Sequence, residues 1–294
     1  MAVTKSIRTF AWLVFVTQVL IVATGGIVRL TASGLGCPTW PSCTGDSFVA
    51  TPEMGIHGVV EFSNRLLFFV LQIIAVIGLI LAWKIRKRRK EIFGLFLVAA
   101  LSVFIQAIIG GITVLSGLNP YVVGLHFLAS VVLVILAALL VYRSYESAGP
   151  RVSTVASDVR LGAYFVAIAT LVLVVLGIMT TGAGPHAGDS GAARNGLNPE
   201  SIQTAHAVSA YVTLFGTLWL WRKAYVAKAI RMWNFTKLTM LVIVLQIIVG
   251  ISQARLALPP VLVTLHMVLA CLLAAGMTMI VATMWVRARD DRQA

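Results

Sequence analysis

The chain has 294 residues, of which 59% are hydrophobic and 11% are charged. Ordinary soluble domains carry roughly a quarter charged residues. A soluble domain of this length could not bury so much apolar surface, so the composition excludes a disordered chain, a small disulfide-rich secreted protein and almost any cytosolic enzyme. A membrane protein with several spans remains.

Eight apolar runs follow one another along the chain. A helix needs about 20 apolar residues to cross the hydrocarbon core. The runs are continuous rather than alternating, which predicts helices. We expect an all-α membrane protein with eight transmembrane helices, the first of them retained rather than cleaved as a signal peptide. The runs lie at about 10–30, 56–83, 91–115, 121–142, 161–181, 203–221, 237–254 and 260–286.

The net charge of +13 reflects membrane orientation. All but four of the 23 lysines and arginines lie before the first span, after the eighth, or in loops on that same side, with the densest run, KIRKRRK, at 84–90. The positive-inside rule then places both termini in the cytoplasm. The exceptions are Arg29, Arg65, Arg194 and Arg255. No soluble domain is present to bind nucleic acid, so we expect the lipid bilayer and no nucleic acid as a partner.

The two halves of the sequence resemble each other. QAIIGGITVLSGLNPYVVGLH at 106–126 and QIIVGISQARLALPPVLVTLH at 246–266 align without gaps, and the shared residues include Gln, Pro and His. Each half begins and ends on the same side of the membrane. The sequence therefore predicts two parallel-repeat four-helix bundles, about 1–146 and 150–294.

Four histidines lie on the even-numbered spans, toward the outer ends of their helices. An ionisable residue inside a membrane is costly and is a functional candidate. Carboxylates and thiolates typical of zinc or di-iron sites are scarce here, whereas paired neutral imidazoles suit heme iron. A proton-relay transporter is the rival interpretation of the same histidines. They are His57, His126, His206 and His266.

The segment HGVVEFSNR at 57–65 is the densest polar cluster within a span. His57, Glu61 and Arg65 recur at helical spacing on one face. A carboxylate beside a reacting group can act as a general base or stabilise positive charge, although an ion pair between Glu61 and Arg65 is an alternative role. QTAH at 203–206 has no such acid, which suggests that the first half does the chemistry and the second carries electrons.

Cys37 and Cys43 frame GCPTWPSC in the first outer loop. The outer face is oxidising, which favours a disulfide. A thiol pair with a redox role and two free thiols are the alternatives.

Together these features resemble the heme A synthase family. The resemblance rests on GGIVRLTASGLGCPTWPSC at 25–43, VVEFSNR at 59–65, the helices containing LH at 125–126 and 265–266, and TGAGPHAGD at 181–189. The family oxidises the C8 methyl of heme O to a formyl group by successive hydroxylation, giving heme A for terminal oxidases. The resemblance thus implies an oxidoreductase of the cell membrane, active in cytochrome oxidase assembly.

The resemblance also assigns roles to residues. The C-terminal half, 150–294, would hold heme b as cofactor through His206 and His266. The N-terminal half, 1–146, would receive heme O, with His126 and His57 on the substrate heme. Glu61 matches the family's catalytic carboxylate, and Cys37 and Cys43 match its outer-loop cysteine pair. Heme O synthase, an electron acceptor and oxidase assembly factors are the implied partners.

One departure concerns the second span. Many members of the family have Glu-x-x-His-Arg there, and this chain has Asn64 in the position of that histidine. His57 lies two turns earlier on the same face, displaced by about 10 Å along the helix axis. The alternatives to heme A synthase are a diheme membrane cytochrome that only passes electrons from quinol and the histidine-based transporter. Because Glu61 is unmatched in the second half, it favours the enzyme.

Overall fold

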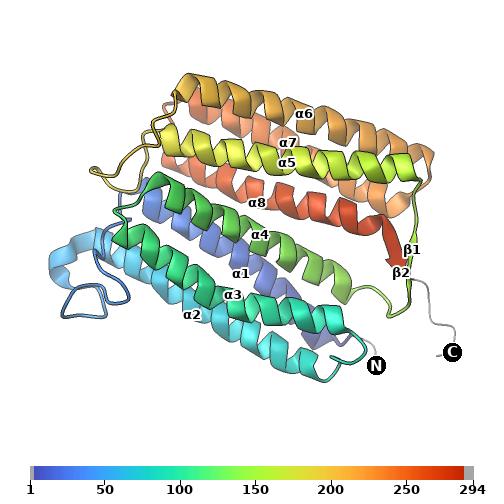
Figure 1. Cartoon of the computed structure of the whole chain (residues 1–294), viewed down its shortest axis with the longest axis horizontal. Coiled ribbons are helices and arrows are strands. Elements are labelled where there is room, and N and C mark those ends of the chain that lie inside the picture. The colour runs from blue at the N-terminus through green and yellow to red at the C-terminus, as the bar shows by residue number, and fades with distance from the viewer. Residues whose placement is uncertain (1–2, 288–294) are drawn as a thin grey trace.

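A computed structural model describes residues 3–287. Eight α-helices run along one axis within this range, and a two-stranded antiparallel sheet lies at one end (Figure 1). The helices are α1 (Lys5–Leu30), α2 (Gly55–Trp83), α3 (Lys90–Leu115), α4 (Pro120–Ser144), α5 (Ser157–Ala183), α6 (Pro199–Val226), α7 (Ile230–Arg255) and α8 (Pro260–Thr283). The strands are β1 (Arg151–Ser153) and β2 (Trp285–Arg287), and a short 3₁₀ helix, η1 (Pro52–Met54), precedes α2.

The eight predicted helices are all present in the described range. Seven of them are long and apolar enough to cross a membrane, so the chain is a multi-pass membrane protein. The exception is α6, which carries the polar segment PESIQTAH in its first two turns. The predicted end of the eighth span at 286 is wrong. The helix stops at Thr283, because the chain turns into β2 and pairs with β1. Arg289 and Arg292 of the basic tail lie outside the described residues.

Local sequence explains where several helices start. Asn119 and Asn198 each accept a backbone hydrogen bond at the start of α4 and α6, from Tyr121 and Ser201 respectively. Proline follows each asparagine as the first helical residue, where its missing N–H costs nothing. These caps fix the first turns of two of the four helices that carry histidines.

Three of the buried apolar clusters show how the helices pack. One buried apolar cluster joins α1 to α4, and a second joins α5 to α8 with the segment around β1. Between them lies a seam where Val22 of α1, Val134 of α4 and Cys271 of α8 pack together. Successive helices contact each other, and α4, α1 and α5 all contact α8. The long α1–α2 and α5–α6 loops lie together at one end, opposite β1 and β2 (Figure 1).

Candidate functional site

The structure brings the imidazole rings of His206 and His266 together. Their centroids are 6.2 Å apart, and the ring planes are inclined by 74°. His206 lies two turns into α6 and His266 lies in the second turn of α8, so the pair sits near the end of the bundle that carries the long loops. Residues separated by 60 positions therefore form one site.

The ring nitrogens of this pair have different partners. Nδ1 of His206 lies 3.1 Å from the carbonyl oxygen of Leu173. Metal-ligating histidines usually make this contact with one nitrogen, which fixes the tautomer and leaves Nε2 for the metal. Nδ1 of His266 is buried and has no hydrogen-bond partner among the described residues. The site therefore offers two neighbouring imidazoles, and Nδ1 of one of them, His266, has no partner among the described residues. Imidazoles are donors that heme iron takes in proteins.

Glycines in the preceding helices make room for both rings. A Cβ atom on Gly177 of α5 would lie 2.9 Å from Cε1 of His206. One on Gly250 of α7 would lie 3.2 Å from Cε1 of His266. Any larger residue would push the rings from their positions, so the glycines help define the site.

His126 of α4 has surroundings like those of His266. Its Nδ1 is also buried without a described partner, and a Cβ on Gly110 would lie 3.5 Å from its Cε1. The turns before the two helices also agree. The N–H of Leu118 donates to Thr113 and the N–H of Leu258 donates to Gln253, each at 2.8 Å. Leu118 and Leu258 both have positive φ, 61° and 59°. These positions are those that the sequence alignment pairs.

His57 differs from the other three histidines. Its side chain is exposed, and Nδ1 lies 2.9 Å from Oγ of Ser33 in the loop after α1. No ring contact joins it to His126 within residues 3–287. Asn64, which stands where the family often has histidine, accepts a hydrogen bond from Thr24 of α1 at 2.7 Å. The first half therefore presents one half-buried histidine, His126, without a histidine partner in the described structure.

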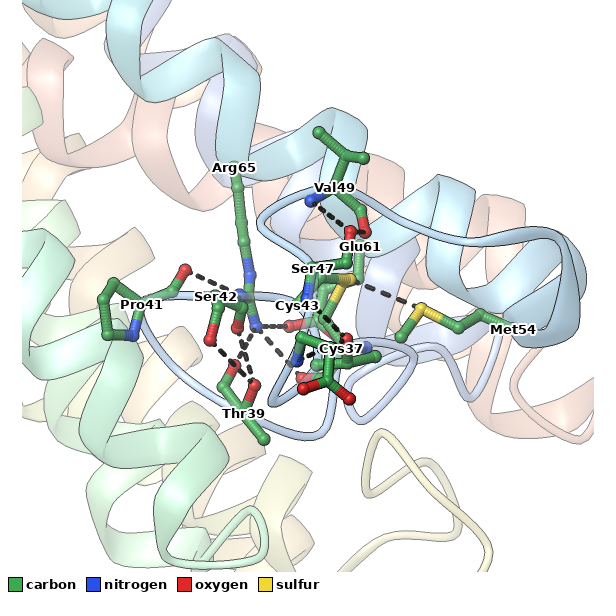
Figure 2. The surroundings of a disulfide bond; sticks show 12 residues. Cys37, Thr39, Pro41, Ser42, Cys43, Ser47, Val49, Met54, Glu61 and Arg65 are labelled. Atoms are coloured by element: carbon green, nitrogen blue, oxygen red, sulfur yellow. Dashed lines mark hydrogen bonds and ion pairs between the residues drawn. A yellow bond between two sulfur atoms is a disulfide. The ribbon is translucent and has the colours of Figure 1, made fainter.

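Glu61 is buried at 5% exposure and uses both carboxylate oxygens. Oε2 accepts a hydrogen bond from the backbone N–H of Cys37 at 2.6 Å, and Oε1 lies 2.5 Å from Nη2 of Arg65 (Figure 2). The ion pair considered from the sequence is thus present. Charge-assisted bonds of this kind are stronger than neutral ones, so the acid anchors the α1–α2 loop to α2.

Cys37 and Cys43 form the predicted disulfide, and both are fully buried. Arg65 reaches from α2 into the loop that they close and donates to the backbone oxygens of Cys37, Thr39 and Ser42 (Figure 2). The disulfide and the Glu61–Arg65 pair therefore hold one compact loop.

The loop packs closely on two helices. A Cβ on Gly36 would lie 2.2 Å from the carbonyl oxygen of His57, so only glycine allows this approach to α2. The indole of Trp40 covers Gly111 of α3, where a Cβ would lie 2.5 Å from the ring. Gly110, the preceding residue, touches His126. The loop thus connects the surroundings of Glu61 with those of His126.

Two residues outside the predicted site join the loops at this end. Arg29 of α1 donates to the carbonyl oxygens of His186 and Thr181, at 2.7 and 3.0 Å. Nε2 of His186 lies 3.0 Å from the carbonyl oxygen of Leu258, in the turn before α8. Arg29 belongs to the motif GGIVR and His186 to the motif GPHAGD. The sequence could have pointed to Arg29 and His186 because each is an ionisable residue inside a motif. It could not show their hydrogen-bond partners, which lie more than 70 positions away.

Comparison with known proteins identifies the family. A family model described as "COX15-CtaA: Cytochrome oxidase assembly protein" matches residues 8–278. The chain belongs to the COX15-CtaA family. The match runs from the first turn of α1 to the last turns of α8 and includes the α1–α2 and α5–α6 loops and every histidine discussed above.

Individual relatives are more distant. A protein of Listeria welshimeri named heme A synthase is 28% identical over 179 residues, covering 60% of this chain and 58% of the relative. Heme A synthases of Halalkalibacterium halodurans and Bacillus pumilus are 28% and 32% identical over 147 residues, covering 50% and 48% of this chain and 49% and 47% of the relatives. The matched part thus spans between about half and three fifths of the length of these relatives.

Proposed function

We propose that the protein is a heme A synthase, an oxidoreductase that converts the C8 methyl of heme O to a formyl group by successive hydroxylation. Its membership of the COX15-CtaA family, matched over residues 8–278, carries this proposal. The heme A synthases among its relatives and the paired imidazoles of His206 and His266 support it.

The chain is proposed to consist of two parallel-repeat four-helix bundles, 1–146 and 150–294. The matching turns at Leu118 and Leu258 support this arrangement, because the same hydrogen bond and the same positive φ recur 140 residues apart. The matching positions of His126 on Gly110 and of His266 on Gly250 support it further.

The second half is proposed to hold heme b between His206 and His266. When bound, this heme would accept and pass on single electrons. The protein's contribution is to fix the imidazoles: Leu173 orients His206, the glycines give the rings space, and apolar helices surround them. A low-polarity surrounding is one of the means by which a protein tunes heme potential.

The first half is proposed to receive heme O, with His126 on the substrate heme and His57 as a second, exposed contact. Oxidation of a methyl group removes electrons and protons, so positive charge builds on that carbon. Glu61 is the acid that would stabilise this charge or take a proton from the attacking water. The second half has no acid in the matching segment QTAH.

The protein is proposed to lie in the cell membrane with both termini in the cytoplasm. The start of α1, the loops after α2, α4 and α6, and β2 lie at one end of the bundle and carry most of the basic residues (Figure 1). The positive-inside rule assigns that end to the cytoplasm. Heme O synthase, an electron acceptor and oxidase assembly factors are the expected protein partners.

One observation favours the diheme cytochrome as a second candidate. Both carboxylate oxygens of Glu61 are engaged by the disulfide loop, which would suffice for a purely structural acid. The product separates the two functions. Expressing the protein in a host that makes heme O but no heme A, and extracting the total heme, should yield heme A from a synthase and only heme O from a cytochrome.

A further inference from the structure

An arginine-rich cluster lies at the end of the bundle that carries the basic loops, outside the site described above. It combines side chains from α3, α4, β1, β2 and the loop residues flanking α3 and α4. We refer to it as the inner arginine cluster. Its members are Arg89, Arg143, Arg151, Arg287, Glu91 and Glu146.

The two glutamates are already paired with buried arginines. Oε1 of Glu91 lies 2.7 Å from Nε of Arg89, and Oε2 of Glu146 lies 2.5 Å from Nη1 of Arg143. Arg89 is 2% exposed and Arg143 is 6% exposed. Buried charges persist where they are paired in this way. Arg287 also contacts both glutamates, and Arg151 forms no ion pair with an acid among the described residues, so the four arginines exceed the two glutamates in charge.

These two arginines are direct neighbours across the small sheet. Arg151 of β1 is paired in register with Arg287 of β2. Like charges directly opposite each other destabilise a strand pair. The pKa of Arg151 lies below its usual value, first because of partial burial and then because of the charges of Arg143 and Arg287. The strand pair thus brings two cations together in a cluster that has more arginines than glutamates.

Donor groups in the cluster also lack acceptors. Nε of Arg143 and Nε of Arg287 are buried without a hydrogen-bond acceptor among the described residues, although Arg287 Nε lies 3.8 Å from Glu146. Nη2 of Arg287 lies 3.1 Å from Glu91 and Nη1 donates to Gly149. The remaining acceptor, Oε1 of Glu146, is likewise unpaired. Guanidinium donors suit phosphate oxygens, which they can bind in a bidentate fork.

We propose that the inner arginine cluster binds the phosphate group of an anionic phospholipid, with Arg151 and Arg287 on either side of it. The cluster lies at the helix ends, at the level of the membrane surface. Basic pockets between transmembrane helices on that side of a membrane recognise anionic headgroups. The strand β1 lies in the segment that connects α4 to α5, and β2 follows α8. A bound headgroup would therefore stabilise the pairing of the two strands.

The test uses the purified full-length protein in neutral detergent with added phosphatidylglycerol or phosphatidylcholine. Phosphatidylglycerol should raise the melting midpoint of the unaltered protein well above the value in phosphatidylcholine. Arg151→Glu should weaken phosphatidylglycerol binding by about thirtyfold and Arg151→Gln by about fivefold, since each basic charge that contacts the headgroup contributes a similar increment to its binding. In phosphatidylcholine alone, Arg151→Glu should melt higher than the unaltered protein, because Glu then faces Arg287.

Lys87→Glu is the matched control, since Lys87 is exposed on the same basic face and has no described side-chain contact with the cluster. It should keep the stabilisation by phosphatidylglycerol. If Arg151→Glu keeps that stabilisation as fully as Lys87→Glu does, the proposal is overturned. Stabilisation by inorganic phosphate but not by phosphatidylglycerol would overturn the lipid as the source of the phosphate.

Discussion

The carboxylate of Glu61 has a structural role and a proposed catalytic role. It fixes the disulfide loop through the N–H of Cys37 and the guanidinium of Arg65, and it is the proposed acid of the substrate site. Removing one partner of a buried ion pair costs about 3–5 kcal/mol when the other charge is left unpaired. Here Arg65 keeps four backbone acceptors in the loop, so the loss of stability should be smaller.

Glu61→Gln keeps the shape of the side chain and removes its charge and basicity. We expect this variant to fold, to keep heme b in the second half, and to accumulate heme O or a hydroxylated intermediate in place of heme A. Chromatography of extracted hemes measures the outcome. Glu53→Gln, which alters an exposed acid in η1, is the control and should make heme A normally. A normal heme A yield from Glu61→Gln would leave Glu61 only as the partner of Arg65.

His206 and His266 should be equally necessary for the second-half heme. His206→Ala or His266→Ala should each remove most of the low-spin heme b signal from the spectrum of the purified protein, because either change leaves only one of the two histidines that would hold the heme. His57→Ala is the comparison, since His57 is exposed and contacts Ser33 instead. A low-spin spectrum that survives either alanine variant would contradict the assignment of this pair.

The loop between α1 and α2 requires a glycine at position 36 in addition to its disulfide. Gly36→Ala would place a Cβ 2.2 Å from the carbonyl oxygen of His57. We expect it to destabilise the protein by about 1–3 kcal/mol, the usual range for overpacking, and to reduce heme A formation. Gly45→Ala, in the same loop but with no atom within 4 Å of its new Cβ, should leave the melting temperature unchanged. Equal melting temperatures for Gly36→Ala and Gly45→Ala would contradict this prediction and show that the loop can shift to accept the added Cβ.

Helix positions and the disulfide could be predicted from the sequence because both depend on local signals. Apolar runs located all eight helices, but the sixth was predicted to begin at 203 and begins at Pro199, because its first turns are polar. Contacts between distant segments could not be predicted. The hydrogen bond from Arg29 to His186 and the pairing of β1 with β2 depend on how segments far apart in the sequence pack together. In addition, strands of three residues carry no periodic signal. The hydrogen bond from the backbone N–H of Cys37 to Glu61 could not be predicted either, because every residue except proline has this donor.

The proposed orientation of the molecule in the membrane rests on its charges and can be measured directly. Ser190→Cys lies in the α5–α6 loop and Lys87→Cys in the basic run after α2, and both positions are exposed. A membrane-impermeant maleimide should label Ser190→Cys in intact cells and Lys87→Cys only after the cells are permeabilised. The reverse pattern would place the basic loops outside and overturn the orientation.

The proposed activity is tested most directly by its product. The unaltered protein is expressed in a host that makes heme O, lacks heme A and has no synthase of its own, and the total heme is extracted and separated by chromatography. We predict that heme A appears, and that purified protein carries heme b in addition to heme O or its oxidation products. Bound heme b with heme O left unchanged in the extract would contradict a synthase and identify a cytochrome that only passes electrons.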